Sequence, residues 1–215
     1  FSEEWVKLAQ QQWPDLAQPV KLHIKIDSGM GRIGVTSKEQ IAQLYKAIEE
    51  APQFVVDGVF THFATADEED TLYFDKQVYI FEELLAALPK KPRLVHIANT
   101  ATALTKAPNL QYDAVRYGIS MYGLLPSAYV GEILPFTLQP AFSLVTELVH
   151  VKKLQAGQSV GYGANYTATE DCYIGTLPIG YADGVIRKLS GQCVLVGGQK
   201  VPIVGRICMD QCMIL

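Results

Sequence analysis

"KLHIKIDSGMGRIGVTSKEQIAQLYKAIEE" (residues 21–50) joins an apolar run, a glycine-rich loop and a segment whose apolar residues recur at helical spacing. The short run at 21–26 predicts a strand, and the spacing between residues 41 and 48 predicts a helix with one buried face. A strand, a loop and a helix in this order make one β/α unit. The stretch therefore indicates an α/β fold with a parallel sheet.

The same pattern repeats along the first part of the chain. Apolar residues recur at helical spacing again between residues 74 and 88, and further strand-like runs are "FVVDGVF" (54–60), "RLVHIA" (93–98) and "DAVRYG" (113–118). Four such units would make half of an eight-stranded β/α barrel, which typically takes about 250 residues. An open α/β sheet is the competing architecture, and periodicity does not separate the two.

From about residue 139 the sequence changes to strand-like runs divided by turns, with no helical period. We therefore expect residues 1–138 to be the C-terminal half of a β/α barrel and 139–215 to be an all-β domain, connected by the proline-containing stretch at 122–140. The chain starts without Met inside an amphipathic pattern and stops in "CMDQCMIL". Both features lead us to expect a fragment, incomplete at both ends.

Composition limits the classes of function. The chain has 215 residues, a formal charge of -4 and 49% hydrophobic residues, without a basic cluster, which argues against a nucleic-acid partner. No apolar run has the length of a membrane span and no signal peptide is recognisable, so we expect a cytoplasmic protein without a membrane partner. The four cysteines lack Cys-x-x-Cys spacing, which favours buried reduced thiols over disulfides or a metal site.

"GMGRIG" (29–34) matches the spacing of the glycine loop that binds the pyrophosphate of dinucleotides. Charged residues surround it, however, with Lys25 and Asp27 before the glycines and Arg32 among them. Charged side chains at the end of a barrel strand suit a small anionic substrate better. A surface turn with a solvated arginine is the alternative.

Polar residues also follow the other expected strands. His62 ends the second, His96, Asn99 and Thr100 end the third, and Arg116 ends the fourth. A lone histidine at such a place is usually a structural residue rather than a catalytic base. Four successive polar strand ends nevertheless indicate a site, because the loops after the last barrel strands commonly bind phosphate.

In the second part, Tyr162 stands between two glycines in "SVGYGANYTA". Glycines on both sides leave a phenol accessible, although an aromatic ring packed over a glycine bend is the simpler interpretation. Tyr181 allows the same two interpretations, and for Met209 and Asp210 the structural alternative is a core residue and a turn residue. No serine-protease order, zinc-protease motif or paired-cysteine set occurs in the sequence.

Seven blocks in this order and spacing resemble the alanine racemases, a pyridoxal-phosphate enzyme family: "KIDSGMGRIGV", "THFATADE", "HIANTATAL", "AVRYGISMYG", "VGYGANYTA", "PIGYADG" and "VGRICMDQCMI". The resemblance covers essentially the whole chain. It implies a homodimer with shared active sites, in which each subunit is a β/α barrel followed by a β-domain. It also implies interconversion of L- and D-alanine, which supplies D-alanine for peptidoglycan.

The resemblance assigns a role to each candidate residue. Tyr162 would be the catalytic acid/base, acting in the partner's active site. Arg32 would bind the substrate carboxylate and the cofactor's phenolic oxygen, and Lys25 would be the residue that can carry a carbamate. Arg116, supported by His62, would face the pyridine nitrogen. The remaining assignments are phosphate binding by Thr100, Gly118 and Ile119, and the substrate entrance by Tyr181, Met209 and Asp210.

One family feature has no match. The lysine that attaches the cofactor lies in a block resembling "KANAYGHG", which does not occur in these 215 residues. We therefore expect the chain alone to be inactive. The alternatives are a racemase of broader substrate range, a non-catalytic pyridoxal-phosphate-binding barrel protein, and a nucleotide-binding α/β module that would use "GMGRIG".

Overall fold

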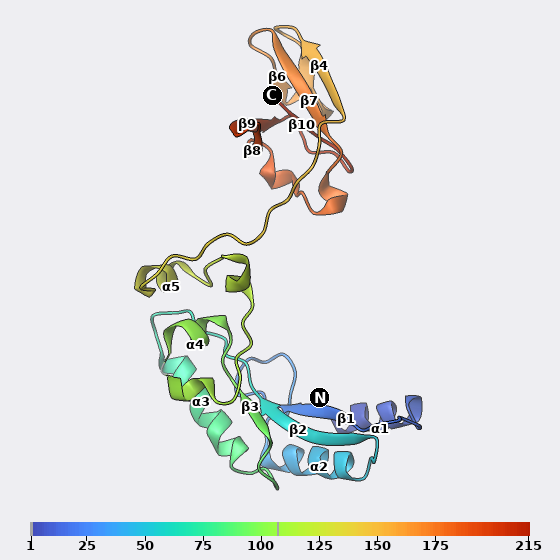
Figure 1. The fold of residues 1–215 in the computed structure, drawn as a ribbon, viewed down its shortest axis with the longest axis vertical. Coiled ribbons are helices and arrows are strands. Elements are labelled where there is room, and N and C mark those ends of the chain that lie inside the picture. The colour runs from blue at the N-terminus through green and yellow to red at the C-terminus, as the bar shows by residue number, and fades with distance from the viewer. Residues whose placement is uncertain (1, 107) are drawn as a thin grey trace. The chain divides into compact units, whose positions relative to one another are not determined.

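The computed structural model describes residues 2–106 and 108–215, which form two compact units, the first running to Phe142 and the second starting at Ser143. Figure 1 shows helices and strands alternating in the first unit and mainly strands in the second. An α/β part is thus followed by a β part, as expected.

The first unit contains strands β1 (Val20–Lys25), β2 (Phe54–Phe60) and β3 (Leu94–His96). Its helices are α1 (Glu3–Gln12), α2 (Lys38–Glu49), α3 (Leu72–Leu85), α4 (Thr100–Thr105) and α5 (Ala128–Ile133), with 3₁₀ turns η1 (Pro108–Gln111) and η2 (Ile119–Tyr122). The strands pair in parallel in the order β1-β2-β3. A barrel and a singly wound open sheet share this order, and the strands described here do not close into a barrel.

The fourth expected strand, 113–118, is reduced to a single parallel bridge between Ala98 and Val115. The reason is that the Asp113 side chain, rather than a backbone carbonyl, accepts one of the hydrogen bonds that a strand ladder would make. The Asp113 carboxylate accepts the N–H of Val95 at 2.8 Å, while the Asp113 N–H donates to the Val95 carbonyl at 3.0 Å. Residues 113–118 nevertheless run alongside the end of β3, where the Arg116 N–H donates to the Ala98 carbonyl at 2.9 Å.

Helices α2 and α3 pack on the sheet with the spacing that the sequence predicts. In α2, Ile41, Leu44, Tyr45 and Ile48 are all buried. Its first turn begins at Ser37, whose hydroxyl accepts the N–H of Gln40 and so satisfies one of the free donors of a helix start. These residues join alternate residues of the strands in one apolar core, in which α3 places Phe74, Phe81 and Leu84.

The proline-containing stretch at 122–140 is not a plain connection, because it contains α5. Ser127 caps this helix by accepting the N–H of Val130, and Val130 is fully buried in the core of the first unit. The sequence prediction missed this element. A six-residue helix with a single buried apolar residue gives too short a period to be recognised.

The second unit contains β4 (His150–Leu154), β5 (Ser159–Val160), β6 (Tyr166–Thr167), β7 (Cys172–Leu177), β8 (Cys193–Val196), β9 (Gln199–Val204) and β10 (Cys212–Ile214), with 3₁₀ turns η3 (Tyr162–Ala164), η4 (Tyr181–Asp183) and η5 (Arg187–Leu189). Five strands form an antiparallel sheet in the order β4-β7-β10-β9-β8. Gly197 and Gly198 join β8 to β9 with φ of 55° and 84°, the positive values that a two-residue type I′ hairpin turn requires.

One strand-like run of the second part is only half a strand. "AFSLVTELVHVKKL" (141–154) suggested a continuous strand, but β4 starts at His150. Most apolar residues before it are exposed, with Val145 at 84%, although Leu144, Val145 and Leu148 line a pocket together with apolar residues of the second unit.

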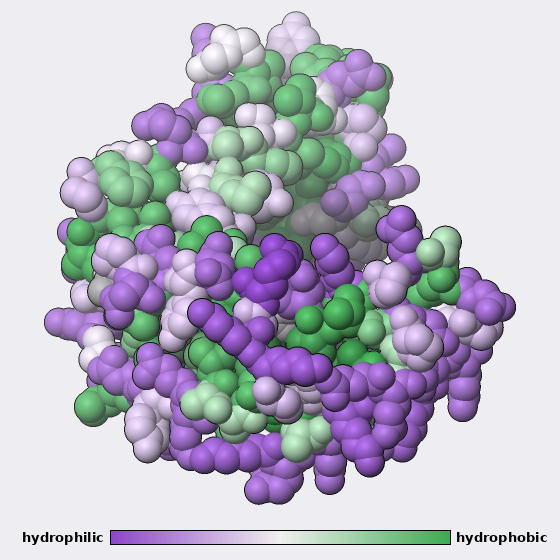
Figure 2. All heavy atoms as spheres, turned by 60° about the horizontal axis from the view of Figure 1, so that its bottom comes forward, coloured by the Kyte–Doolittle hydropathy of each residue, from purple (hydrophilic) through white to green (hydrophobic). Residues whose placement is uncertain are grey.

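The surface of the molecule matches its composition. Figure 2 shows hydrophilic side chains over much of the face that comes forward, with smaller hydrophobic areas between them. Within residues 2–106 and 108–215, no helix is both long and apolar enough to cross a membrane.

The four thiols are free, but only Cys212 is buried and Cys193 is exposed, so the expectation of four buried thiols is wrong. Cys193 lies on β8, an edge strand that is covered on one side only.

Candidate functional site

The candidate residues of the first unit lie at one edge of the sheet. Lys25 ends β1, His62 follows β2, Thr100 follows β3, and Arg116 follows the bridge residue Val115. Because the strands are parallel, their carboxyl ends meet at the same edge, where α/β proteins commonly bind ligands.

The glycine loop 27–35 folds back onto β1. The Asp27 N–H donates to the Val35 carbonyl at 2.8 Å, and the Val35 N–H donates to the Lys25 carbonyl at 2.9 Å. Gly29, Gly31 and Gly34 all have positive φ, and a Cβ on Gly34 would lie 2.8 Å from the Lys25 carbonyl oxygen. The glycines therefore allow a tight return of the chain to its own strand.

Asp27 occupies the donors that a phosphate would need. Its carboxylate accepts backbone N–H groups of Gly29 at 3.0 Å, Gly31 at 3.1 Å and Arg32 at 3.2 Å. Burial opposes the charge of Asp27, but the N–H groups of Gly29 and Gly31 outweigh it and hold its pKa below the ordinary value. The N–H groups of the loop are thus used in hydrogen bonds within the loop, which argues against the dinucleotide interpretation of "GMGRIG".

Lys25 is only 2% exposed, although it carries an ammonium group. Its Nζ donates to the Ile33 carbonyl at 2.7 Å. Burial lowers the pKa of Lys25; Arg32 and Arg116 lower it further, while Asp27 opposes them. The site thus gathers cations, and a neutral or modified Lys25 amine would relieve their repulsion.

Arg116 is held by several acceptors. Its Nη1 donates to the His96 carbonyl at 2.8 Å and lies 2.6 Å from His96 Nδ1. Its Nη2 donates to the Thr61 carbonyl at 2.5 Å and lies 3.4 Å from His62 Nδ1. Burial lowers the pKa of Arg116, yet a guanidinium remains protonated. None of the hydrogen bonds found among the described residues uses Arg116 Nε, which leaves one donor for a ligand.

The surroundings of both imidazoles beside Arg116 favour the neutral form. Burial, and then the charge of Arg116, lowers the pKa of His62. Burial, Arg116 and His23 together lower the pKa of His96 to about 4. Neutral rings can accept hydrogen bonds from the guanidinium, so Arg116 carries the only charge of this trio.

The three residues expected at a phosphate lie together. Thr100 is the first residue of α4, and its Oγ1 accepts the N–H of Gly118 at 2.8 Å. Asn99 caps the helix by accepting the N–H of Thr102 at 3.0 Å. Ile119 follows Gly118 directly and starts η2. The sequence separates these residues by 18 positions, and the Ala98–Val115 bridge brings them together.

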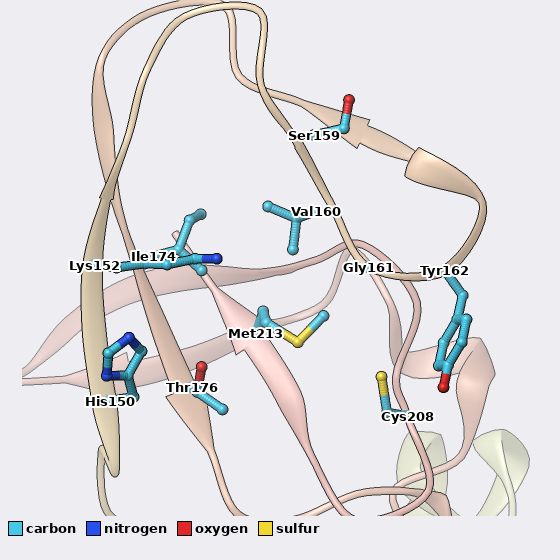
Figure 3. A pocket seen from close by; sticks show the side chains of 10 residues that line it. All are labelled: His150, Lys152, Ser159, Val160, Gly161, Tyr162, Ile174, Thr176, Cys208 and Met213. Atoms are coloured by element: carbon cyan, nitrogen blue, oxygen red, sulfur yellow. The ribbon is translucent and has the colours of Figure 1, made fainter.

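In the second unit, Tyr162 projects outward. Gly161 and Gly163 have φ of 75° and 74°, and the tyrosine between them is 72% exposed. Within the described chain its ring is thus not packed over the glycine bend. Tyr162 borders a pocket of about 470 Å³ that Cys208 and Met213 also line (Figure 3).

Tyr181 and Met209 lie on two loops that are hydrogen-bonded to each other. The Tyr181 N–H donates to the Cys208 carbonyl at 3.0 Å, and the Ala182 N–H donates to the Met209 carbonyl at 2.8 Å. Met209 and Asp210 are exposed. The second unit thus gathers Tyr181, Met209 and Asp210 in one place.

Three residues with clear contacts in the first unit were not among the sequence candidates: His23, Asp57 and, as a backbone acceptor, Asp27. The signal for His23 was parity, because His23 and Lys25 share one face of β1 while Ile24 and Ile26 are buried in the apolar core. Asp57 gave no such signal, because it has the same parity as the buried Val59 and the pairing register skips it. Among the residues that the structure describes, no group of His, Cys, Asp and Glu could hold a metal ion.

The chain matches solved and curated proteins over its whole length. It is 50% identical over 212 residues to the alanine racemase of Listeria innocua, covering 97% of this chain and 57% of that protein. The crystal structure of alanine racemase from Bacillus anthracis with bound L-Ala-P superposes with a TM-score of 0.89 at 46% identity, covering 100% of this chain and 56% of that one. A histidine racemase from Leuconostoc mesenteroides gives a TM-score of 0.85 at 36% identity, covering 99% and 57%.

These coverages mean that the chain spans a little more than half the length of the relatives it matches. Two family models match it in sequence order. The alanine racemase N-terminal domain matches residues 1–126, and the alanine racemase C-terminal domain matches residues 141–215. The resemblance seen in the seven sequence blocks is confirmed, and the chain belongs to the alanine racemase family.

Proposed function

We propose that the protein to which this chain belongs interconverts L-alanine and D-alanine with pyridoxal phosphate and so supplies D-alanine for peptidoglycan. The observation that carries the proposal is the arrangement around Arg116. A guanidinium is fixed between neutral imidazoles, with one donor unused, at the sheet edge that also holds Lys25 and the Thr100–Gly118 pair.

The architecture that goes with this function is also a proposal. Residues 1–138 would be the C-terminal half of a β/α barrel, and residues 139–215 would belong to a β-domain. Two such subunits would form a homodimer with shared active sites, so that Tyr162 of one subunit would act in the site of the other. The exposure of the Tyr162 phenol is consistent with this role.

The residues present fit the cofactor. Arg116 Nε would donate a hydrogen bond to the pyridine nitrogen, while the Thr100 hydroxyl and the backbone N–H groups of Gly118 and Ile119 would hold the phosphate. The Gly118 N–H, which here donates to Thr100 Oγ1, would exchange this acceptor for a phosphate oxygen. His62 would support Arg116 through Nδ1. Pyridoxal phosphate, when bound, supplies the electron sink that makes an α-proton removable.

Arg116 would determine how strong that sink is. A guanidinium has a pKa above about 12 and donates a hydrogen bond without giving up its proton. The neutral His62 and His96 place no further charge beside it. The arrangement would therefore moderate the electron withdrawal and favour return of the proton over side reactions.

Arg32 and Lys25 would serve the substrate. Arg32 would bind the alanine carboxylate and the cofactor's phenolic oxygen. The lowered pKa of the buried Lys25 favours the free amine, which is the form that reacts with carbon dioxide to give a carbamate. A carbamate would turn the repulsion between Lys25 and Arg32 into an ion pair. Tyr181, Asp210 and the backbone at Met209 would line the substrate entrance.

Racemisation needs a proton donor on each face of the α-carbon. Tyr162 would exchange its phenolic proton at one face, and the family's lysine, which has no match in these 215 residues, would act at the other. The 215-residue chain alone should therefore be inactive.

The test uses the full-length protein loaded with pyridoxal phosphate. Chiral chromatography should detect D-alanine formed from L-alanine, and Arg116→Lys should lower the turnover by at least about 100-fold, the lower end of what a preorganised donor contributes. Lysine keeps a positive charge but loses the planar fork, so it separates geometry from charge. Full turnover of Arg116→Lys would remove Arg116 from the pyridine nitrogen.

A racemase for other amino acids is the second candidate. It is favoured by the likeness to the histidine racemase from Leuconostoc mesenteroides at 36% identity. The same assay with L-histidine decides between the two. A higher kcat/KM for L-alanine supports an alanine racemase, and a higher kcat/KM for L-histidine supports the second candidate. A non-catalytic pyridoxal-phosphate-binding barrel is disfavoured because the chain also matches the family's C-terminal domain.

A further inference from the structure

A line of polar side chains crosses all three strands of the first unit and ends at Arg116. His96 on β3 lies with its Nδ1 2.6 Å from Arg116 Nη1, and with its Nε2 2.6 Å from His23 Nδ1 on β1. The other nitrogen of His23, Nε2, lies 3.6 Å from Asp57 Oδ2 on β2. The first two contacts are hydrogen bonds, and the third is an electrostatic contact.

Only one arrangement of protons satisfies this line. A guanidinium can only donate, so His96 Nδ1 must accept and the His96 proton must be on Nε2. That proton is donated to His23 Nδ1, which places the His23 proton on Nε2, facing the Asp57 carboxylate. Each ring therefore carries a proton on Nε2, and the hydrogen bonds all run in one direction, from Arg116 to His23.

The outer end of the line is anchored by charge. Arg93 donates to Asp57 Oδ1 through Nε at 2.7 Å and to Oδ2 through Nη2 at 2.6 Å. This bidentate ion pair with Arg93 lowers the pKa of Asp57 to about 2, so the carboxylate is charged at neutral pH. The Asp57 side chain is only 11% exposed, so it is partly shielded from water.

Gly58 provides the space in which the two imidazoles meet. It lies on β2 between His23 on β1 and Leu94 on β3 in the pairing register. A Cβ on Gly58 would lie 2.7 Å from His23 Nδ1 and from His23 Cε1, closer than real contacts allow. The φ of Gly58 is not positive, so the backbone itself would accept alanine. The missing side chain is thus used by the His23 ring.

Phe60 fixes the inner half of the line. Its ring stacks on His96 with centroids 5.1 Å apart and an angle of 9°. The Arg116 guanidinium lies 5.1 Å from the centre of the same ring. Phe60 therefore restrains both partners of the Arg116–His96 hydrogen bond.

We propose that Asp57 and His23 are positioning residues for Arg116, acting through His96 by a single fixed tautomer in both imidazoles. The inference rests on the proposed function for its consequence, since Arg116 would be the group that faces the cofactor's nitrogen. Asp57 and His23 do not touch the cofactor; they hold the ring that orients the guanidinium.

Two variants interrupt the line in different ways. Gly58→Ala fills the space of the His23 ring, and Asp57→Asn removes the charge at the outer end. Asp171→Asn is the matched control, because Asp171 is likewise paired with a cationic side chain, that of Lys153, but lies in the second unit. Thermal unfolding of the full-length protein with bound pyridoxal phosphate shows whether each variant folds.

The first measurement is nitrogen NMR of the full-length protein with labelled histidine. We expect both His96 and His23 to carry the proton on Nε2. In Gly58→Ala the His96 ring proton should exchange with water at least tenfold faster, and in both variants His23 should become a mixture of tautomers. A His23 proton on Nδ1 in the unaltered protein would overturn the proposal.

The second measurement is the kinetics of racemisation. Both variants should lower kcat about tenfold with little change in KM, the lower end of what the loss of an outer partner costs at ligating histidines, while Asp171→Asn keeps full turnover. Unchanged kcat in both variants would refute the positioning role even if Arg116→Lys is inactive. Normal activity of Arg116→Lys would instead refute the proposed role of Arg116, while the NMR result would still decide the tautomers.

Discussion

Asp27 offers a sharp test of how the glycine loop is held. Asp27→Ala removes the carboxylate that accepts N–H groups from Gly29, Gly31 and Arg32. A hydrogen bond to a charged group contributes about 1.5–3 kcal/mol. The bonds to Gly31 and Arg32 are exposed and water replaces most of their value, so the partly buried bond to Gly29 dominates and we estimate a total of about 2 kcal/mol.

The loss should appear as local opening of the loop. About 2 kcal/mol corresponds to about a 30-fold faster exchange of the Gly29 amide hydrogen, measured by NMR in the full-length protein. The carboxylate has a lowered pKa, so its effect is present at neutral pH and disappears only as the pH falls below the ordinary value of 3.8. Exchange in the unaltered protein should therefore gain speed in acid, beyond its intrinsic pH dependence.

Asp27→Asn distinguishes the two carboxylate oxygens. Oδ1 accepts from Gly29 and Gly31, whereas Oδ2 accepts from Arg32. An amide that keeps its oxygen toward the two glycines places its NH₂ against the Arg32 N–H, so Arg32 should lose its protection most. Asp70→Asn is the matched control, because Asp70 accepts the N–H of Leu72 in another loop. If Asp27→Ala leaves Gly29 exchange within twofold, the loop is held by other contacts and the reasoning fails.

Three further predictions concern other parts of the chain. In the full-length protein, Tyr162→Phe should abolish α-hydrogen exchange of L-alanine with deuterated water while exchange of D-alanine persists, and Tyr79→Phe, another exposed phenol, should change neither; equal loss of both exchanges would remove Tyr162 as a separate base. The exposed Cys193 should react with a thiol reagent before the buried Cys212, whose pKa is raised by burial; mass mapping that finds Cys212 first would contradict this. Phe81→Ala should destabilise the protein by about 3–5 kcal/mol in urea unfolding, because Phe81 is fully buried, and a change below 1 kcal/mol would disprove its core role.

The sequence predicted the elements with a strong period. Residues 38–49 and 72–85 formed the two helices expected, since each buries several apolar residues at helical spacing. The short elements were missed because few residues carry them: Val130 is the only fully buried residue of α5, and the Asp113 carboxylate replaces part of a strand ladder. Barrel closure was expected from the number of units, and the order of three parallel strands does not decide it.

The site was predictable in part for a similar reason. Polar residues at the ends of the expected strands identified Lys25, His62, Thr100 and Arg116, which the structure places at one sheet edge. Sequence spacing does not show which hydrogen bonds these residues make. The roles of Asp27 as a loop acceptor and of Gly58 as open space depend on contacts between strands, and such contacts appear only in three dimensions.

The strand order of the second unit has a consequence for the growing polypeptide. β10 lies between β7 and β9, although it is the last of the three to be synthesised. At about 5–20 residues per second, the ribosome adds the residues between β7 and β10 in a few seconds. During that interval the edge of β7 that β10 will cover is open to pairing with other nascent chains, and the edge of β9 is open as well once residues 199–204 have been made. Slow translation of residues 178–214, for example at rare codons, should therefore increase aggregation of the newly made protein.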